Sequence, residues 1–161
     1  MKQCMKYLFL AVITASAGTY VFSHCEVPCG IYDDALRAKL IMEHISTIEK
    51  SMQQINTLAK EADKNYNQIV RWINNKEHHA GEIQHIASQY FITQRIKITD
   101  PADQAKYQKY LKELSLLHEI IVYAMKCKQT TDEANTAALT KALKAFNLSY
   151  FGKEDPTTHS H

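Results

Sequence analysis

The spacing of apolar residues constrains the fold of this chain more than any other feature of its sequence. Between residues 33 and 65, apolar positions recur in alternating steps of three and four, which places them on one face of a long α-helix that packs against neighbours at a shallow angle. Asp33 and Asp34 precede this stripe, where carboxylates cap a helix and complement its dipole. The stripe consists of Ala38, Ile41, Ile45, Ile48, Met52, Ile55, Ala59 and Ala62.

A second and a third helical stretch follow. Residues 66–96 carry the second stripe, which is interrupted by an unusually polar middle at residues 74–79. Asp100 and Pro101 then have the residue types of a helix cap and a first turn, so we predict that the third helix starts there. The apolar positions of the two stretches are Ile69, Ile73, Ala80, Ile83, Ala87 and Tyr90, then Tyr107, Leu111, Leu114, Leu117, Ile121 and Ala124.

The fourth stretch completes the predicted fold. Thr130 and Glu133 match a capping box, the apolar positions are Leu139, Leu143 and Phe146, and Gly152 ends the pattern. Only 4 glycines and 3 prolines occur in 161 residues, which is few for a β-rich fold with many tight turns. We therefore predict an all-α, antiparallel up-down four-helix bundle over residues 33–152, followed by a flexible tail at residues 153–161.

Residues 1–23 have the features of a removable signal or pro-segment. Lys2 and Lys6 give a basic start, residues 7–17 form an apolar run, and the small Ser23 would precede a cut before His24. The run is short for a bilayer span, which argues against the alternative of an uncleaved anchor. We expect a leader-processing peptidase and export to the periplasm or the extracellular space, or cytoplasmic location if the segment is removed inside the cell.

The charge balance excludes one class of partner. The chain has a formal net charge of +2, and the two leader lysines account for all of it. The mature chain is then neutral and offers no basic surface of the kind that binds nucleic acid. We expect neither nucleic acid nor, after cleavage, a membrane among its partners.

The stretch from His24 to Tyr32, His-Cys-Glu-Val-Pro-Cys-Gly-Ile-Tyr, holds an imidazole and two thiols just after the leader. If the cut falls before His24, its amine and the Cys25 amide can close a chelate ring on one metal ion. The thiolates of Cys25 and Cys29 can complete a plane, and the imidazole can add an axial ligand. Square-planar nitrogen and sulfur ligation suits Ni(II) or Cu(II) better than Zn(II). Electron-donating amide and thiolate ligands would also stabilise Ni(III).

Several alternatives share these residues. Cys25 and Cys29 could form a disulfide in a structural exported bundle, because the compartment is oxidising. A secreted nickel- or copper-binding protein could use the same ligands without redox turnover. A di-iron bundle would need a second copy of Glu82-x-x-His85, which the sequence lacks. Histidines such as His78, His79, His85 and His118 are more often surface or interface residues.

The motif His-Cys-x-x-Pro-Cys-Gly-x-Tyr after a leader and before a four-helix bundle resembles nickel superoxide dismutase. The likeness extends to Ser88-Gln89-Tyr90-Phe91 late in the second helix. The resemblance implies an antioxidant oxidoreductase that converts superoxide to dioxygen and hydrogen peroxide by Ni(II)/Ni(III) cycling. It implies one nickel ion per chain in an N-terminal hook at residues 24–32, and a homohexamer.

Carried across by motif, the resemblance implies that His24, Cys25 and Cys29 bind the metal. It implies that Tyr32 limits anion access and holds solvent beside the metal, and that Tyr90 is the second tyrosine of that pocket.

The sequence departs from the family pattern around the axial histidine. Better-known members hold this histidine with a glutamate in the first helix and an arginine in the second. An ungapped count puts Leu40 at the glutamate's place and Asn75 or Lys76 at the arginine's. We expect a different or shifted set of partners for His24, with Glu43, His44 or Lys76 as candidates.

Overall fold

In a computed structural model of the chain, residue 30 and residues 32–156 are described, and the helices belong to the unit Tyr32–His161. The leader, the three metal-ligand candidates His24, Cys25 and Cys29, and residues 157–161 lie outside the described residues. Over the described ranges the chain forms helices and no strand.

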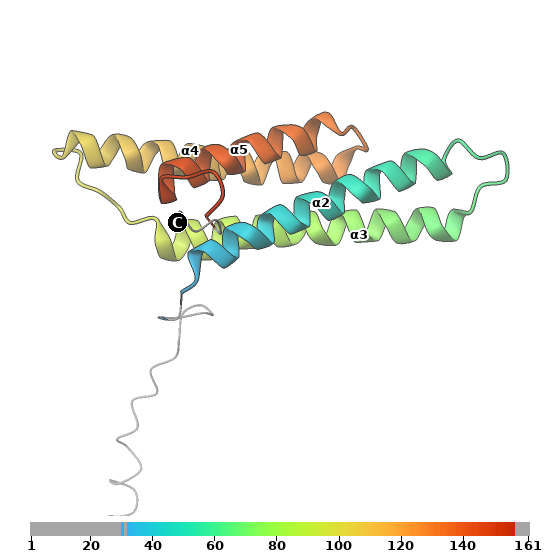
Figure 1. The fold of residues 1–161 in the computed structure, drawn as a ribbon, viewed down its shortest axis with the longest axis horizontal. Helices are drawn as coiled ribbons and strands as arrows, with labels where there is room; N and C mark the ends of the chain where they lie inside the picture. Colours follow the sequence, from blue (N-terminus) through green and yellow to red (C-terminus); the bar gives the residue numbers. More distant parts are fainter. Residues whose placement is uncertain (1–29, 31, 157–161) are drawn as a thin grey trace, which may run out of the picture. The chain divides into compact units, whose positions relative to one another are not determined.

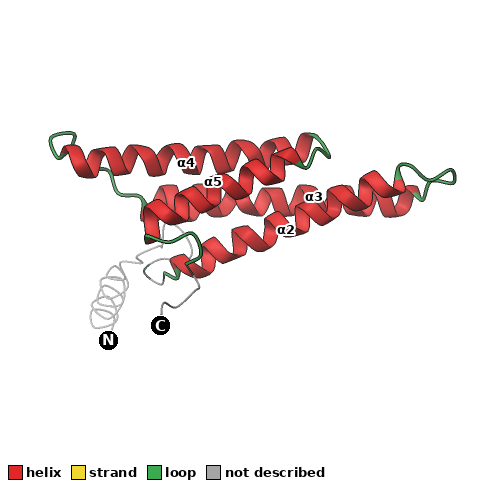
Figure 2. Ribbon diagram, turned by 45° about the horizontal axis from the view of Figure 1, so that its top comes forward, coloured by secondary structure: helices red, strands yellow, loops and turns green. Residues whose placement is uncertain are grey.

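The helices form two antiparallel pairs (Figure 1). Helix α2 (Asp34–Leu58) lies beside α3 (Tyr66–His85), and α4 (Gln104–Gln129) lies beside α5 (Ala134–Phe151). The π-helix η2 (Ile86–Arg95) continues α3 without a break. Figure 2 shows the same pairing from a second direction. The predicted all-α four-helix bundle is confirmed.

The core lies where the stripes meet. In α2 the predicted positions from Ala38 to Ile55 are all buried, and Leu139, Leu143 and Phe146 of α5 are buried as well. The stripe of α4 is partly wrong, because Leu111 is 40% exposed whereas Ile120 is fully buried. Near its first turns, α4 extends beyond the other helices in Figure 1, so apolar residues there have less to pack against.

Two predicted helix starts are corrected by the structure. Asp103 caps α4 by accepting a hydrogen bond from the backbone N–H of Lys106, whereas Asp100 forms the preceding turn. The capping box before α5 does not form, because the Thr130 hydroxyl accepts from the N–H of Asp132. The Asp132 carboxylate then accepts from the N–H of Ala134 and serves the first turn of the helix instead.

The ends of two other helices also test the sequence pattern. Helix α2 ends at Leu58 rather than near residue 65, and Ala59 and Ala62 lie outside it in an exposed connection. Their small side chains bury little apolar surface, so they contribute little to extending the helix. Gly152 ends α5 as predicted, with a left-handed φ of 78° that an L side chain rarely adopts. In the following segment, the backbone oxygen of Glu154 accepts a hydrogen bond from Asn147.

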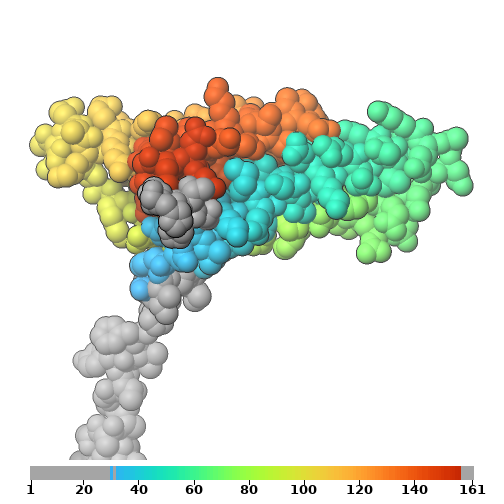
Figure 3. All heavy atoms as spheres, in the orientation of Figure 1, coloured from blue at the N-terminus to red at the C-terminus, as the bar shows by residue number. Residues whose placement is uncertain are grey.

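Three segments that are distant in sequence meet at one end of the bundle. The first turn of α2, the π-helix η2 and the last turns of α5 lie together there (Figure 1). The connection between α2 and α3 lies at the other end, which Figure 3 shows in green. None of the described helices combines the length and apolarity that a membrane-crossing helix requires.

Candidate functional site

Tyr32 is the first residue of the helical unit, and its ring is held on two sides. The residue is 40% exposed. Its ring meets the ring of Tyr90 edge to face, with centroids 6.0 Å apart. The guanidinium carbon of Arg95 lies 4.3 Å from the centroid of Tyr32, at the distance of a cation–π contact. The structure therefore brings together the two tyrosines that the sequence singled out, and adds an arginine that it did not.

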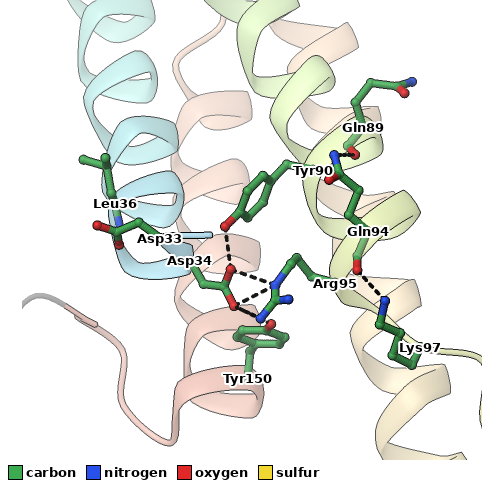
Figure 4. A network of polar contacts seen from close by, with 9 residues as sticks. All are labelled: Asp33, Asp34, Leu36, Gln89, Tyr90, Gln94, Arg95, Lys97 and Tyr150. Carbon is green, nitrogen blue, oxygen red and sulfur yellow. Dashed lines mark hydrogen bonds and ion pairs between the residues drawn. The ribbon is translucent and has the colours of Figure 1, made fainter. Parts of the chain in front are cut away.

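The carboxylate of Asp34 is the centre of this end of the bundle (Figure 4). Its Oδ1 accepts from the Tyr90 hydroxyl at 2.6 Å and from Nε of Arg95 at 2.8 Å. Its Oδ2 accepts from Arg95 Nη2 at 2.8 Å and from the Tyr150 hydroxyl at 2.7 Å. One carboxylate thus connects α2, η2 and α5 through charge-assisted hydrogen bonds, which are stronger than neutral ones.

The π-helix explains how Tyr90 and Arg95 reach the same carboxylate. In an α-helix of 3.6 residues per turn, residues i and i+5 lie about 140° apart around the axis. A π-helix forms i→i+5 hydrogen bonds, which place such residues on one face. The backbone N–H of Ile96 accordingly donates to the oxygen of Phe91 at 2.9 Å. The wider turn of η2 points Tyr90 and Arg95 toward Asp34 together.

The electrostatics of this network keep every member in its usual charge state near neutral pH. Burial alone would raise the pKa of Asp34, but the hydrogen bonds from Arg95, Tyr90 and Tyr150 bring it below its ordinary value. Burial and the bond to Asp34 raise the pKa of Tyr90, and the same causes raise that of Tyr150 to about 12. Both hydroxyls therefore stay protonated and serve as donors.

Tyr150 and Arg95 are site residues that sequence reasoning missed. Tyr150 packs against Phe91 and Phe146, with ring centroids 5.8 and 5.3 Å apart, so the core holds its hydroxyl in place. Arg95 falls outside the apolar stripe of the second helix, and a period of 3.6 residues turns it away from Tyr90. A signal was present in the unusual run of aromatic residues near the ends of the second and fourth helices.

Gly30 is the described residue nearest in sequence to the metal-ligand candidates. Gly30 has a φ of 77°, a left-handed conformation that favours glycine, and it directly follows Cys29. His24, Cys25 and Cys29 themselves lie outside the described residues, so their assignment as ligands stays a prediction. Their side-chain donors, two thiols and an imidazole, are of the types that bind nickel.

The candidate partners of His24 are all engaged elsewhere in the described structure. Glu43 forms an ion pair with Lys39 at 3.8 Å. Lys76 is buried, and its ammonium group donates to the backbone oxygens of Cys127 and Lys128 at the end of α4. Since Lys76 precedes Tyr90 by 14 positions, it lies about 20 Å away along the helix.

His44 forms a histidine pair with His79 across α2 and α3. The Nδ1 atoms of the two rings lie 2.7 Å apart, so one ring donates and the other accepts. Burial, and the charge each ring would feel from neighbouring imidazoles, lower the pKa of both, so the neutral pair is favoured. The polar middle of the second helix is thus partly explained by a contact between helices.

The described His, Cys, Asp and Glu residues do not form a further metal-binding cluster of their own. Within the described part of the chain, no group of three or more of these residues is arranged to hold a metal ion. His85 and His118 are exposed. Cys127 is a buried free thiol, and burial raises its pKa to about 11, so it carries no thiolate at neutral pH.

A family model described as nickel-containing superoxide dismutase matches residues 15–154. The matched range contains the three metal-ligand candidates, both predicted tyrosines and the four helices. A comparison with the curated proteins gave no match, and neither did a comparison with the solved structures.

Proposed function

Because the chain belongs to the nickel-containing superoxide dismutase family, we propose that it disproportionates superoxide at a nickel ion held by His24, Cys25 and Cys29. The family membership makes it an oxidoreductase with a nickel cofactor and superoxide as its substrate. In the reaction, one superoxide ion is oxidised to dioxygen, and a second one takes up that electron and two protons to form hydrogen peroxide. Bound nickel supplies the one-electron chemistry by alternating between Ni(II) and Ni(III).

The single observation that carries this proposal is the family match over a range that includes the hook. The residues fit it, because the His24 amine, the Cys25 amide and thiolate, and the Cys29 thiolate form a nitrogen and sulfur ligand set. The left-handed Gly30 directly after Cys29 is consistent with a chain that turns back on itself. One nickel ion per chain follows from one hook per chain.

The roles of the two tyrosines follow from their different surroundings. Tyr32 is partly exposed, and its hydroxyl forms no hydrogen bond within the described residues, so it is free to order solvent and anions. Tyr90 is 4% exposed, and its hydroxyl is committed to Asp34. We assign Tyr90 to the wall of the pocket, where its ring limits the space beside Tyr32.

Maturation and assembly complete the proposal. A peptidase removes residues 1–23 and exposes the His24 amine, which a longer chain cannot supply. We propose export on the basis of the leader, with pro-segment removal in the cytoplasm as the other outcome. The proposed homohexamer follows the family, and exposed apolar side chains such as Tyr66 and Val70 on α3 are compatible with contacts between subunits.

The experiment compares the chain that begins at His24 with one that carries a single extra residue before it. Both are purified, and their intact mass, nickel content and rate of superoxide consumption are measured. We expect the first to bind one nickel ion, keep both cysteines reduced and consume superoxide. We expect the second to be inactive, because its first nitrogen is no longer on His24. Activity in the extended chain would exclude the proposed ligand set.

The same measurements separate the alternatives. A protein that binds nickel without consuming superoxide, and without a rhombic Ni(III) electron-resonance signal, is a metal-sequestering protein. A protein with a Cys25–Cys29 disulfide and no bound nickel is a structural bundle. Size-exclusion chromatography with light scattering determines whether six chains assemble.

A further inference from the structure

We propose that Asp34 and Arg95 are positioning residues of the reaction, which hold the ring of Tyr32 in one orientation. This inference rests on the proposed function for its link to catalysis. Nothing in the motif assigns a role to either residue. In the structure, Arg95 contacts the ring of Tyr32, and Asp34 binds Arg95.

The first step is that Asp34 acts as a fixed acceptor rather than as a base. Five hydrogen bonds from three side chains occupy its two oxygens, and the Asp34 side chain is 15% exposed. Those donors also keep its pKa below the ordinary value. A carboxylate in this state takes up no proton near neutral pH, so its effect is to fix the donors around it.

The second step concerns the plane of the guanidinium. Arg95 donates from Nε and Nη2 to the two oxygens of Asp34, at 2.8 Å each, in a bidentate pair. Because the guanidinium is planar, two bonds along its edge also fix the direction of its face. The central carbon of the guanidinium lies over the Tyr32 ring, 4.3 Å from its centroid, and the ring of Tyr90 meets Tyr32 edge to face. The orientation of Tyr32 is therefore set by Asp34 through Arg95.

The third step separates positioning from electrostatic attraction of the substrate. A cation near the site attracts superoxide, and such steering raises association rates at low ionic strength. Here the Asp34 carboxylate pairs with the Arg95 charge, so the pair is close to neutral as a unit. The two roles predict opposite effects for Asp34→Asn. Loss of positioning lowers the rate, whereas an uncovered guanidinium would raise it at low salt.

The test uses the nickel-loaded mature protein with Arg95→Lys, Asp34→Asn and a matched control, Arg71→Lys on the exposed part of α3. Lysine keeps the charge but lacks the planar face and the second donor. We expect kcat/KM to fall about tenfold in Arg95→Lys, with an unchanged dependence on ionic strength, since misplacement of site groups by about 1 Å costs that much or more. The control should equal the parent.

A second measurement reports the ring itself and needs neither nickel nor activity. The tyrosine ring ¹³C resonances are recorded in the metal-free protein, and Tyr32→Phe identifies the signal of Tyr32. We expect this signal to move toward that of a solvent-exposed tyrosine in Arg95→Lys and Asp34→Asn, while the signals of the tyrosines far from this end stay in place.

Two results would overturn the inference. One is a Tyr32 signal in Arg95→Lys that equals that of the parent. The other is a rate that rises at low salt in Asp34→Asn, which would identify Arg95 as a steering cation. If the parent consumes no superoxide, the proposed function fails, yet the resonance of Tyr32 still decides whether Arg95 holds the ring. Should Asp34→Asn fail to fold, Arg95→Lys carries both measurements.

Discussion

At the scale of single residues, the site contains two tyrosines that differ in solvent exposure and in the hydrogen bonding of their hydroxyls. The Tyr90 hydroxyl donates to Asp34 at 2.6 Å, and burial removes it from solvent. Tyr32 is held through its ring alone within the described residues, and 40% of it is exposed. A polar group that remains accessible can order water and anions, whereas one already paired in the core contributes to stability.

We predict that Tyr32→Phe lowers superoxide consumption modestly, by less than about tenfold, and leaves the nickel content unchanged. The phenyl ring preserves the contacts with Arg95 and Tyr90, and only the hydroxyl that orders solvent is lost. Stopped-flow rates and metal analysis on the same sample test this. Loss of bound nickel in the variant would contradict the assignment, because it would make Tyr32 part of the metal-binding set.

Tyr90→Phe is the matched comparison for that variant. It removes one donor from a largely buried carboxylate, which costs about 1–3 kcal/mol in the free energy of unfolding. Urea unfolding should therefore separate the two phenylalanine variants, with the larger loss at Tyr90. Equal stability of both would show that the bond to Asp34 contributes nothing measurable.

At the scale of the helices, periodicity predicted which segments are helical but not their local geometry. The stripe of α2 was correct from Ala38 to Ile55 because those positions have a partner helix along their length. The π-helix was not predicted, because the apolar stripe of residues 66–96 was interpreted with a period of 3.6 residues, which places Arg95 away from Tyr90. The N-cap of α4 was assigned to the wrong residue because two nearby aspartates can each accept a backbone hydrogen bond. Asp103 caps the helix, and Asp100 accepts from the preceding turn.

The histidine pair between α2 and α3 predicts a loss of stability in mild acid. The pKa values of His44 and His79 lie below the ordinary 6.5 in the folded state, through burial and the neighbouring His78, and despite Glu82 and, at His44, Glu43. The unfolded chain then binds protons more readily. The stabilising contribution of the neutral pair is therefore complete above about pH 6.5 and decreases as the pH falls below it.

Urea unfolding of the bundle at pH 7.5 and at pH 5 measures this effect. We expect His44→Gln to flatten the difference between the two pH values, because it removes one of the two titrating rings. His118→Gln is the control, since His118 is exposed on α4 and should leave the pH dependence as it is. An identical pH dependence in parent and His44→Gln would show that the pair does not titrate in this range.

At the scale of the whole molecule, the sequence predicts the chemistry of the hook more fully than its supports. The ligand types and their spacing are local, so nine consecutive residues suffice to indicate nickel. The residues that contact the Tyr32 ring come from η2, and Tyr150 of α5 binds Asp34; both elements lie far along the chain from Tyr32. Their assembly depends on how the helices pack, and the sequence pattern alone did not identify Arg95 or Tyr150.

The bundle and the hook should be separable in stability. The described core consists of side chains from α2 to α5 that pack against one another, so the helices bury their apolar faces among themselves. We therefore predict that Cys25→Ser or Cys29→Ser leaves the helical circular-dichroism signal and the melting temperature of the metal-free protein unchanged, while the bound nickel and its thiolate absorption are lost. Collapse of the helical signal in either variant would show that these cysteines are structural.

Cys127→Ser makes the same chemical change, and we predict the opposite outcome, a loss of stability without a loss of nickel. Cys127 is fully buried in the core between helices, so a hydroxyl there should cost about 1–3 kcal/mol in the free energy of unfolding. Its thiol is far along the chain from the hook, and we expect nickel binding at the level of the parent. The three variants together separate the metal site from the fold, because each serine should change either nickel binding or the stability of the bundle and leave the other unchanged. A loss of nickel in Cys127→Ser at temperatures where the variant is folded would link the two.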